Sequence, residues 1–367
     1  MPRIWPRSIG RAAFVAVGAG AIAFSVLVAH IGLGAIAQAM RALGWGGFGL
    51  IVALHLGVIG LAGCAWWNLG RGLRVGRLRC FVWGRLIRDS AGEALPFSQV
   101  GGFVMGARAA ALCGVSGTFA AASTVVDLTV ELAGRVPYMV LGLAMLVWLA
   151  PVQWLVVPAL LGTLLLAAAA VAFFTVTAHG AGAIDAAIEK LGARLAPQWA
   201  AARGGTATAL QATIRAIHAD RGAMGAGVLL HFAGWLLSGI EVALPLWLMG
   251  VHLSFPMGIR EGIVIDCAVS AIRSATFVAP NVIGLQEGAY VLLCGLFGID
   301  PQVALALSLL RRGRDLAIAI PSLLAWQLRE GQLAWRGAGR DPLAPAIPAP
   351  VIPAPVIPAP AETFRPE

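Results

Sequence analysis

Four polar residues that could carry chemistry recur at one-turn spacing inside an otherwise apolar stretch: Ser123, Asp127, Glu131 and Arg135. Residues four apart lie on the same face of a helix, so these side chains would form one stripe. A charged group in hydrocarbon costs at least about 2.5 to 3.5 kcal/mol, so such a stripe must face protein or water. We expect a headgroup or proton pathway there; the alternative is a structural Glu131–Arg135 pair near the lipid headgroups.

A second charged group interrupts the last apolar segment of the chain. Its members are Arg311, Arg312, Arg314 and Asp315. Either these arginines line a cavity that accepts anions, or the segment is two pieces and the group lies at an interface. We favour the cavity, because the 13 residues from 316 to 328 are too few to cross a bilayer alone.

Two apolar regions, 81–112 and 259–298, are broken by proline and glycine. The breaks fall at Pro96, Gly101 and Gly102, and again at Pro280, Gly284 and Gly288. Arg85 and Arg88 precede the first break, and Arg273 precedes the second. Irregular backbone at membrane depth is tolerated only where protein buries it or water fills a cavity. The pattern therefore predicts two re-entrant hairpins of opposite orientation, an arrangement typical of transporters.

Three further acids are candidate coupling sites: Glu241 inside an apolar span, Asp266 ahead of the second break, and Glu287 within it. The histidines share no ligand spacing, and neither a hydrolase motif nor a nucleotide-binding motif occurs. We therefore expect no metal, no cofactor and no catalytic residue. The five cysteines show no CxxC spacing, and we interpret them as small core residues rather than disulfides or metal ligands.

Composition sets the environment in which these side chains must work. Of 367 residues 59% are hydrophobic and only 12% are charged, which excludes an ordinary soluble fold. The net charge of +9 would suit nucleic acid in a soluble chain. Here the basic residues cluster between apolar stretches, where they fix orientation and attract anionic lipid, so membrane lipids are the expected partners and nucleic acid is not.

Apolar stretches of about 20 residues, long enough to cross a bilayer, recur along the chain. We expect crossings at roughly 12–33, 47–68, 117–149, 153–178, 223–250 and 302–328. The fold class predicted is an all-α polytopic membrane protein with about six full crossings and two inverted re-entrant hairpins; eight crossings are the alternative. Region 117–149 is expected to be one long tilted helix, kinked near Pro137.

The remaining segments complete the predicted organisation. Residues 1–11 form a cytoplasmic N-terminus, 12–330 the transmembrane domain, and 331–367 a disordered proline-rich tail. Apolar spacing inside the loop 179–222 fits either an interfacial amphipathic helix or a solvated connector. Arginine clusters place both termini in the cytoplasm, and we expect a multi-pass protein of a bacterial inner membrane.

The pattern RxxRDSxGExLPxxxxGGxxxGxR over 85–108, followed by Ser123, Asp127 and Glu131, is similar to the lysylphosphatidylglycerol synthase transmembrane (flippase) family. FVAPNVIGLQEG at 277–288 and ALSLLRRGRD at 306–315 resemble its second half. The resemblance covers roughly residues 10 to 330, and within the family the chain looks most like the hopanoid-biosynthesis-associated membrane proteins.

The resemblance implies movement of a lipid between leaflets, with the re-entrant elements lining the path. Matching positions are Arg85, Pro96, Gly101, Gly102, Arg108, Asp127, Glu131, Pro280, Glu287, Gly288 and Arg312. The chain departs from the bifunctional members because it ends in a proline tail, so we expect no aminoacyl-transferase domain and no lipid lysinylation.

Three functions remain open from the sequence. The first is a lipid transporter or flippase, which the opposed breaks and intramembrane arginines favour. The second is a membrane-embedded lipid-modifying enzyme with Asp127 and Glu131 as acid and base. The third is a non-catalytic scaffold for proteins of lipid or hopanoid biosynthesis.

Overall fold

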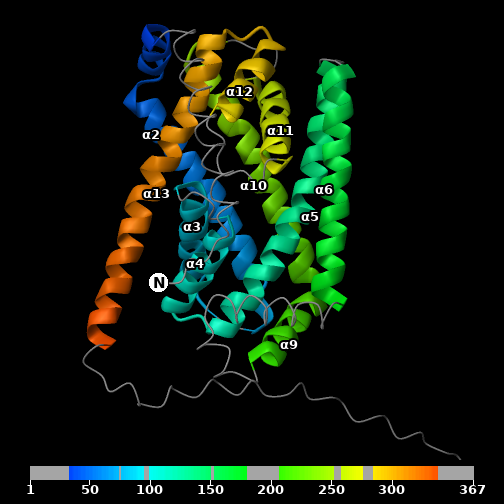
Figure 1. The fold of residues 1–367 in the computed structure, drawn as a ribbon, viewed down its shortest axis with the longest axis vertical. Coiled ribbons are helices and arrows are strands. Elements are labelled where there is room, and N and C mark those ends of the chain that lie inside the picture. The colour runs from blue at the N-terminus through cyan, green and yellow to red at the C-terminus, as the bar shows by residue number, and fades with distance from the viewer. Residues whose placement is uncertain are drawn as a thin grey trace, which may run out of the picture. The chain divides into compact units, whose positions relative to one another are not determined.

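The computed structural model describes residues 33–73, 76–94, 99–149, 153–179, 206–251, 258–275 and 284–337 (Figure 1). The chain divides into a compact unit, Met1–Leu328, and a second unit, Arg329–Glu367, whose described residues are helical. All contacts reported below lie within the first unit. The expected first crossing at 12–33, most of the loop 179–222 and the proline-rich tail lie outside the described residues.

The described residues form helices and no strand, which confirms an all-α fold. In chain order the elements are α2 (Leu33–Asn68), the short 3-10 helix η1 (Arg71–Leu73), α3 (Leu78–Ala94), α4 (Gln99–Leu112), α5 (Gly117–Leu149), α6 (Gln153–His179), α9 (Thr206–Ala219), α10 (Arg221–Leu248), α11 (Ile259–Ala275), α12 (Leu285–Gly295) and α13 (Pro301–Gly337).

Four of the described helices are long and apolar enough to cross a membrane. They contain Arg41–Asn68, Gly117–Leu149, Leu155–Ala178 and Arg221–Leu248. These segments coincide with four of the six expected crossings. Helix α5 is a single element of 33 residues, about 50 Å long, which exceeds a hydrocarbon core of about 30 Å. Region 117–149 is therefore one long helix, as the sequence predicts, and it contains Pro137.

Helix α13 runs without interruption through residues 311–315. The alternative in which the arginine-rich segment is two separate pieces is therefore wrong. Because of the charged residues at these positions, α13 is not apolar enough to be a candidate membrane span. They also stand where its buried surface meets other helices, because Leu307 and Leu310 are both fully buried.

Helices α5 and α10 organise the unit. Helix α10 packs against α2, α5 and α11, and α5 packs in addition against α4, α6 and α9 (Figure 1). One apolar core gathers around Trp66, Phe81 and Phe119, between α2, α3 and α5. A second gathers around Leu246 and Tyr290, where α10, α11, α12 and α13 meet.

Helices α3 and α4 form an antiparallel pair (Figure 1). A Cβ atom at Gly102 would approach the Arg88 carbonyl oxygen to 2.6 Å, and one at Gly106 would approach the Gly84 carbonyl oxygen to 2.8 Å. Residue numbers therefore fall along one helix as they rise along the other, and glycine allows the two backbones to touch. The region 81–112 turns back on itself, which is the predicted hairpin and not a single crossing.

Helices α11 and α12 also pack together, and both are too short to cross a bilayer alone. The connection 276–283, with Pro280, and the connection 95–98, with Pro96, lie outside the described residues. The helix pairs on either side of both predicted breaks are therefore present. Their re-entrance into the membrane stays a prediction.

One cysteine interpretation is wrong. Cys80 and Cys113 form a disulfide that joins the beginning of α3 to the turn after α4. The antiparallel pairing of α3 and α4 brings these residues together although 33 positions separate them, and no local sequence signal marks such a pair. Cys267 and Cys294 are buried free thiols in the apolar core, as predicted for small core residues.

The close approach of α3 and α4 can be tested with Gly102→Ala. The added methyl group would overlap the Arg88 backbone, so we expect a loss of about 1–3 kcal/mol of stability. Thermal unfolding of the detergent-solubilised protein measures it. Gly225→Ala in α10 is the control, because nothing lies within 4 Å of its Cβ position. Equal melting temperatures for both variants would contradict the contact.

Candidate functional site

The first charge network joins α3 to α5. Arg85 directs Nη1 and Nη2 to the two carboxylate oxygens of Glu131, each at 2.9 Å. Arg88 reaches Asp127 Oδ2 at 2.8 Å and Glu131 Oε2 at 2.6 Å. Arg85 Nε also donates to Asp89, one turn further along α3, at 2.8 Å. Such two-pronged contacts are the strong form of the arginine–carboxylate interaction.

Helical spacing explains how these side chains come to face one another. Arg85, Arg88 and Asp89 are separated by three and four positions and share one face of α3, while Asp127 and Glu131 share one face of α5. Phe103 of α4 covers the Arg88 guanidinium at 4.0 Å from its ring centre. The α3–α4 pair thus presents its arginines to α5 and shields one of them.

Helix α10 closes the same network. His231 Nε2 lies 3.1 Å from Asp127 Oδ1, so Asp127 contacts charged or polar groups from two helices. One turn earlier on α5, Ser123 accepts a hydrogen bond of 2.8 Å from the Trp66 indole of α2. The first charge network is defined as Arg85, Arg88, Asp89, Asp127, Glu131 and His231.

Arg135, the fourth member of the predicted stripe, turns to different partners. Its Nη2 donates to the Ser270 carbonyl at 3.1 Å, and its guanidinium lies 4.7 Å from the Trp235 ring centre. The partners of Glu131 are Arg85 and Arg88 rather than the structural pair with Arg135 that the spacing alone allowed. The stripe exists on α5, but Glu131 and Arg135 have different partners.

The second charge network surrounds α13. Its three arginines project in different directions, because successive residues of a helix are rotated by about 100°. Each one reaches an acid on a different helix. Arg311 contacts Asp266 of α11 at 3.1 Å, and Arg314 contacts Glu241 of α10 at 2.8 Å. Arg312 contacts Glu287 of α12. One short stretch of α13 therefore ties three helices together.

Neutral and basic groups complete this second network. The Tyr138 hydroxyl of α5 donates to Asp266 at 2.9 Å, and His55 of α2 contacts Glu241 at 2.9 Å. The backbone N–H of Gly284 donates to Glu287 at 2.7 Å. The second charge network is defined as His55, Glu241, Asp266, Glu287, Arg311, Arg312, Arg314 and Asp315.

Burial makes these pairs mutually dependent. The side chains of Asp127, Glu241 and Glu287 are fully buried, and that of Arg314 is 4% exposed. Removing one partner of such a pair leaves an uncompensated charge, which costs about 3–5 kcal/mol. A charged ligand that takes the place of one partner would pair with the other. One member of such a pair can therefore be replaced by another charged group, but it cannot be removed without a replacement.

The other residues singled out from the sequence fall around the networks. Gly102 touches the Arg88 backbone, and Arg108 is exposed on α4. Gly284 precedes α12 with a φ of 98°, a conformation that favours glycine, and its contact with Glu287 caps the helix. Gly101 and Gly102 lie inside α4 and Gly288 lies inside α12, so the prediction that these three glycines break the helices is wrong. Pro96, Pro280 and the side chain of Arg273 lie outside what the structure describes.

Sequence reasoning missed the two histidines and Tyr138. His55 and His231 share no ligand spacing, yet each contacts a buried acid. The signal that identifies them is their position, because an ionisable residue inside an apolar span is by itself a functional candidate. Tyr138 carries no comparable signal, since a tyrosine in a membrane helix is most often a packing residue.

Asp127, Glu131 and His231 also place ligand atoms within 4.8 Å of one another, close enough to hold a metal ion. However, Arg85 and Arg88 already contact both carboxylate oxygens of Glu131 and Oδ2 of Asp127, and His231 contacts Oδ1 of Asp127. Guanidinium groups at 2.6–2.9 Å would have to leave before a cation could bind. The arrangement is therefore better suited to ion pairing than to a divalent metal.

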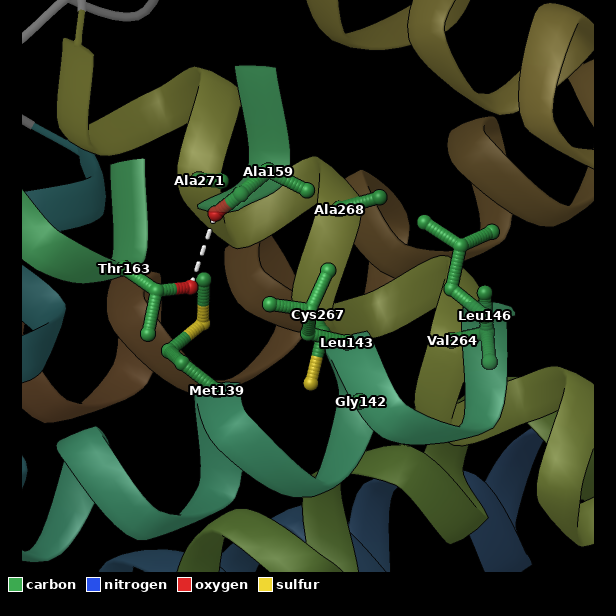
Figure 2. A pocket seen from close by; sticks show the side chains of 10 residues that line it. All are labelled: Met139, Gly142, Leu143, Leu146, Ala159, Thr163, Val264, Cys267, Ala268 and Ala271. Atoms are coloured by element: carbon green, nitrogen blue, oxygen red, sulfur yellow. Dashed lines mark hydrogen bonds between the residues drawn. The ribbon is translucent and has the colours of Figure 1, made fainter. Parts of the chain in front are cut away.

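A small pocket between α5, α6 and α11 is apolar (Figure 2). Its one hydroxyl, on Thr163, donates to the Ala159 carbonyl at 2.8 Å and is therefore satisfied within α6. The sulfur of Cys267 and the backbone of Gly142 form part of the remaining wall. The pocket offers no charged group to a headgroup, so the charge networks remain the better candidates for a binding path.

A family model described as the lysylphosphatidylglycerol synthase TM region matches residues 11–322. The match includes every member of both charge networks and both predicted breaks. No curated protein and no solved structure matches the chain.

The first network can be tested by removing one arginine. Arg88→Met should lower stability by about 3–5 kcal/mol, because Asp127 and Glu131 lose a buried partner. The double variant Arg88→Met/Asp127→Leu should recover part of this loss, since the most deeply buried acid is then also gone. Chemical unfolding of the solubilised protein measures both.

Arg79→Met provides the matched control, because Arg79 is an exposed arginine of the same helix. We expect it to change stability by no more than about 0.5 kcal/mol. A loss as large as that of Arg88→Met would mean that charge pairing is not what makes Arg88 important.

Proposed function

We propose, because the chain belongs to the lysylphosphatidylglycerol synthase transmembrane family, that this multi-pass membrane protein moves a lipid between the two leaflets of its membrane. The observation that carries the proposal is the pair of buried charge networks. The first network ties α3 to the α5 span. The second ties α11 and α12 to α13, and the hydrogen bond from Tyr138 to Asp266 ties α11 to the α5 span as well.

The chemistry of the networks suits a charged headgroup. Guanidinium groups that bind carboxylates bidentately also bind phosphate, so a lipid phosphate can replace Glu131 or Glu287 as the partner of an arginine. The released acid would then be left for a cationic part of the headgroup or for a proton. A headgroup could pass through the interior by exchanging partners, without leaving any charge unpaired.

The cargo we propose is an anionic phospholipid or a hopanoid-type lipid. The hopanoid option rests on the resemblance of the sequence to hopanoid-biosynthesis-associated members. The arginine clusters between apolar segments support a bacterial inner membrane with both termini in the cytoplasm. Proteins of lipid biosynthesis or other transport proteins are the partners to be expected if the cargo is delivered directly.

A membrane-embedded enzyme is the second candidate, supported by the proximity of Asp127, Glu131 and His231. A general acid or base must be able to exchange a proton with its substrate. Both carboxylates here already accept hydrogen bonds from Arg85 or Arg88, and these guanidinium groups would have to be displaced before either acid could exchange a proton with a substrate. An enzyme would change the chemical structure of a lipid, whereas a flippase changes only its leaflet.

Reconstitution into vesicles tests the proposal. Lipid labelled in one leaflet should move faster with the purified protein than in empty vesicles, and mass spectrometry should find it chemically unchanged. Arg312→Gln and Glu287→Gln should each slow movement by about tenfold or more, because a charged hydrogen bond is worth about 1.5–3 kcal/mol. The readout is the accessibility of the label to a membrane-impermeant quencher.

Arg41→Gln serves as the matched control, since Arg41 is exposed at the beginning of the α2 span. Its rate should equal that of the wild type. Movement no faster than in empty vesicles would overturn the proposal. A chemically altered lipid would instead favour the enzyme, and undiminished function of both variants in cells would favour a scaffold.

A further inference from the structure

His55 occupies an unusual position in the second charge network. It lies on α2 inside a membrane span, and its Nδ1 atom is 2.9 and 3.1 Å from the two carboxylate oxygens of Glu241. On the other side of the ring, Nε2 is 4.0 Å from Asp315 Oδ1. Both nitrogens of one imidazole therefore face carboxylates that belong to different helices.

This geometry is best satisfied by a ring that carries two protons. A neutral imidazole has one N–H donor and one lone pair, whereas the imidazolium has two donors. If Nδ1–H donates to Glu241, a neutral ring turns its Nε2 lone pair towards the carboxylate of Asp315, which is repulsive. A proton on Nε2 converts that repulsion into attraction.

The local charge balance also favours a ring that carries two protons. Glu241 and Asp315 share a single guanidinium, that of Arg314, at 2.8 and 2.6 Å. Two negative charges thus face one positive charge, and a proton on His55 makes the group neutral. The neighbouring pairs of Arg311 with Asp266 and Arg312 with Glu287 are each balanced by themselves.

Charged residues on the other helices that pack against α2 do not alter this count at His55. Helices α3 and α5 place their acids mainly in the first network, where arginines pair with them. The titratable or charged residues of these two helices are Arg79, Cys80, Arg85, Arg88, Asp89, Glu93, Asp127, Glu131, Arg135 and Tyr138.

His55 differs from the corresponding histidine of the first network, His231, in the exposed fraction of its side chain. The His55 side chain is 22% exposed, while that of His231 is 3% exposed. Of the two rings, that of His55 is therefore the less enclosed by protein. Its partner Glu241 is fully buried, so the effect of the proton is felt inside the bundle.

We propose that His55, held between Glu241 and Asp315, is a proton-binding site that couples lipid movement to a proton gradient. The inference rests on the proposed transport function and adds its coupling ion. In each cycle one proton from water adds to the Nε2 lone pair and later leaves it. The protonated ring competes with Arg314 for the carboxylates of Glu241 and Asp315, so the proton weakens their hold on Arg314 and permits α13 to exchange partners, and loss of the proton restores that hold.

Proton binding is measured first, and separately from transport. Full-length protein with ¹⁵N-labelled histidine is placed in lipid nanodiscs, and the His55 signal is identified by its loss in His55→Gln. Lowering the pH from 8 to 5, the range in which histidine ordinarily changes charge, should convert this signal to that of the imidazolium. Asp315→Asn, which keeps the contact with Glu241, should move the conversion to more acidic pH.

Coupling is then measured in vesicles with an imposed pH gradient. The gradient should accelerate lipid movement by the wild type at least severalfold. For His55→Gln the ratio of rates with and without the gradient should fall to one. His218→Gln is the matched control, because His218 lies on α9 and contacts the Ile214 carbonyl outside both networks. It should keep the wild-type ratio.

The possible results separate the two proposals. A His55 signal that does not change between pH 8 and 5, or wild-type movement that ignores the gradient, overturns the coupling and leaves the transport function standing. Wild-type protein that moves no lipid under either condition overturns the transport function and the coupling with it. Should His55→Gln not fold, as judged by its melting curve, Asp315→Asn must show the reduced gradient response instead.

Discussion

The cost of leaving a charge unpaired inside hydrocarbon is the constraint on which the rest of this structure depends. Each arginine and each carboxylate in the two charge networks contacts an oppositely charged partner, and most of these partners lie on another helix. Such pairs contribute little net stability, because desolvation offsets much of their attraction. They do restrict the arrangement of helices, since any packing that separates the partners is heavily penalised.

The two networks apply this constraint in different ways. In the first, two arginines on one helix face two acids on another, so α3 and α5 are joined along a single seam. In the second, three arginines of α13 reach α10, α11 and α12 separately. A shift of α13 would therefore break charge pairs with several helices at once, whereas the charge pairs that α3 makes with another helix all go to α5.

The sequence was sufficient to predict the helices and the kinds of residue in the site, but not the pairs. Periodic polarity identified Asp127 and Glu131, and the interruption of an apolar run identified Arg311, Arg312 and Arg314. The partners are separated by 39 positions for Arg88 and Asp127 and by 186 for His55 and Glu241. Helical spacing carries information over about one turn only, so contacts of this range, like the Cys80–Cys113 disulfide, could not be read from it.

The Cys80–Cys113 bond has a consequence for how the first helix pair can move. Helices α3 and α4 are joined by the disulfide at one end and by residues 95–98 of the chain at the other, so together they form a closed covalent ring. Because both ends are closed, the two helices cannot separate progressively from one end. Any displacement of Arg85 and Arg88 relative to α5 must move α4 as well, and the same bond limits how far the two helices can slide past each other.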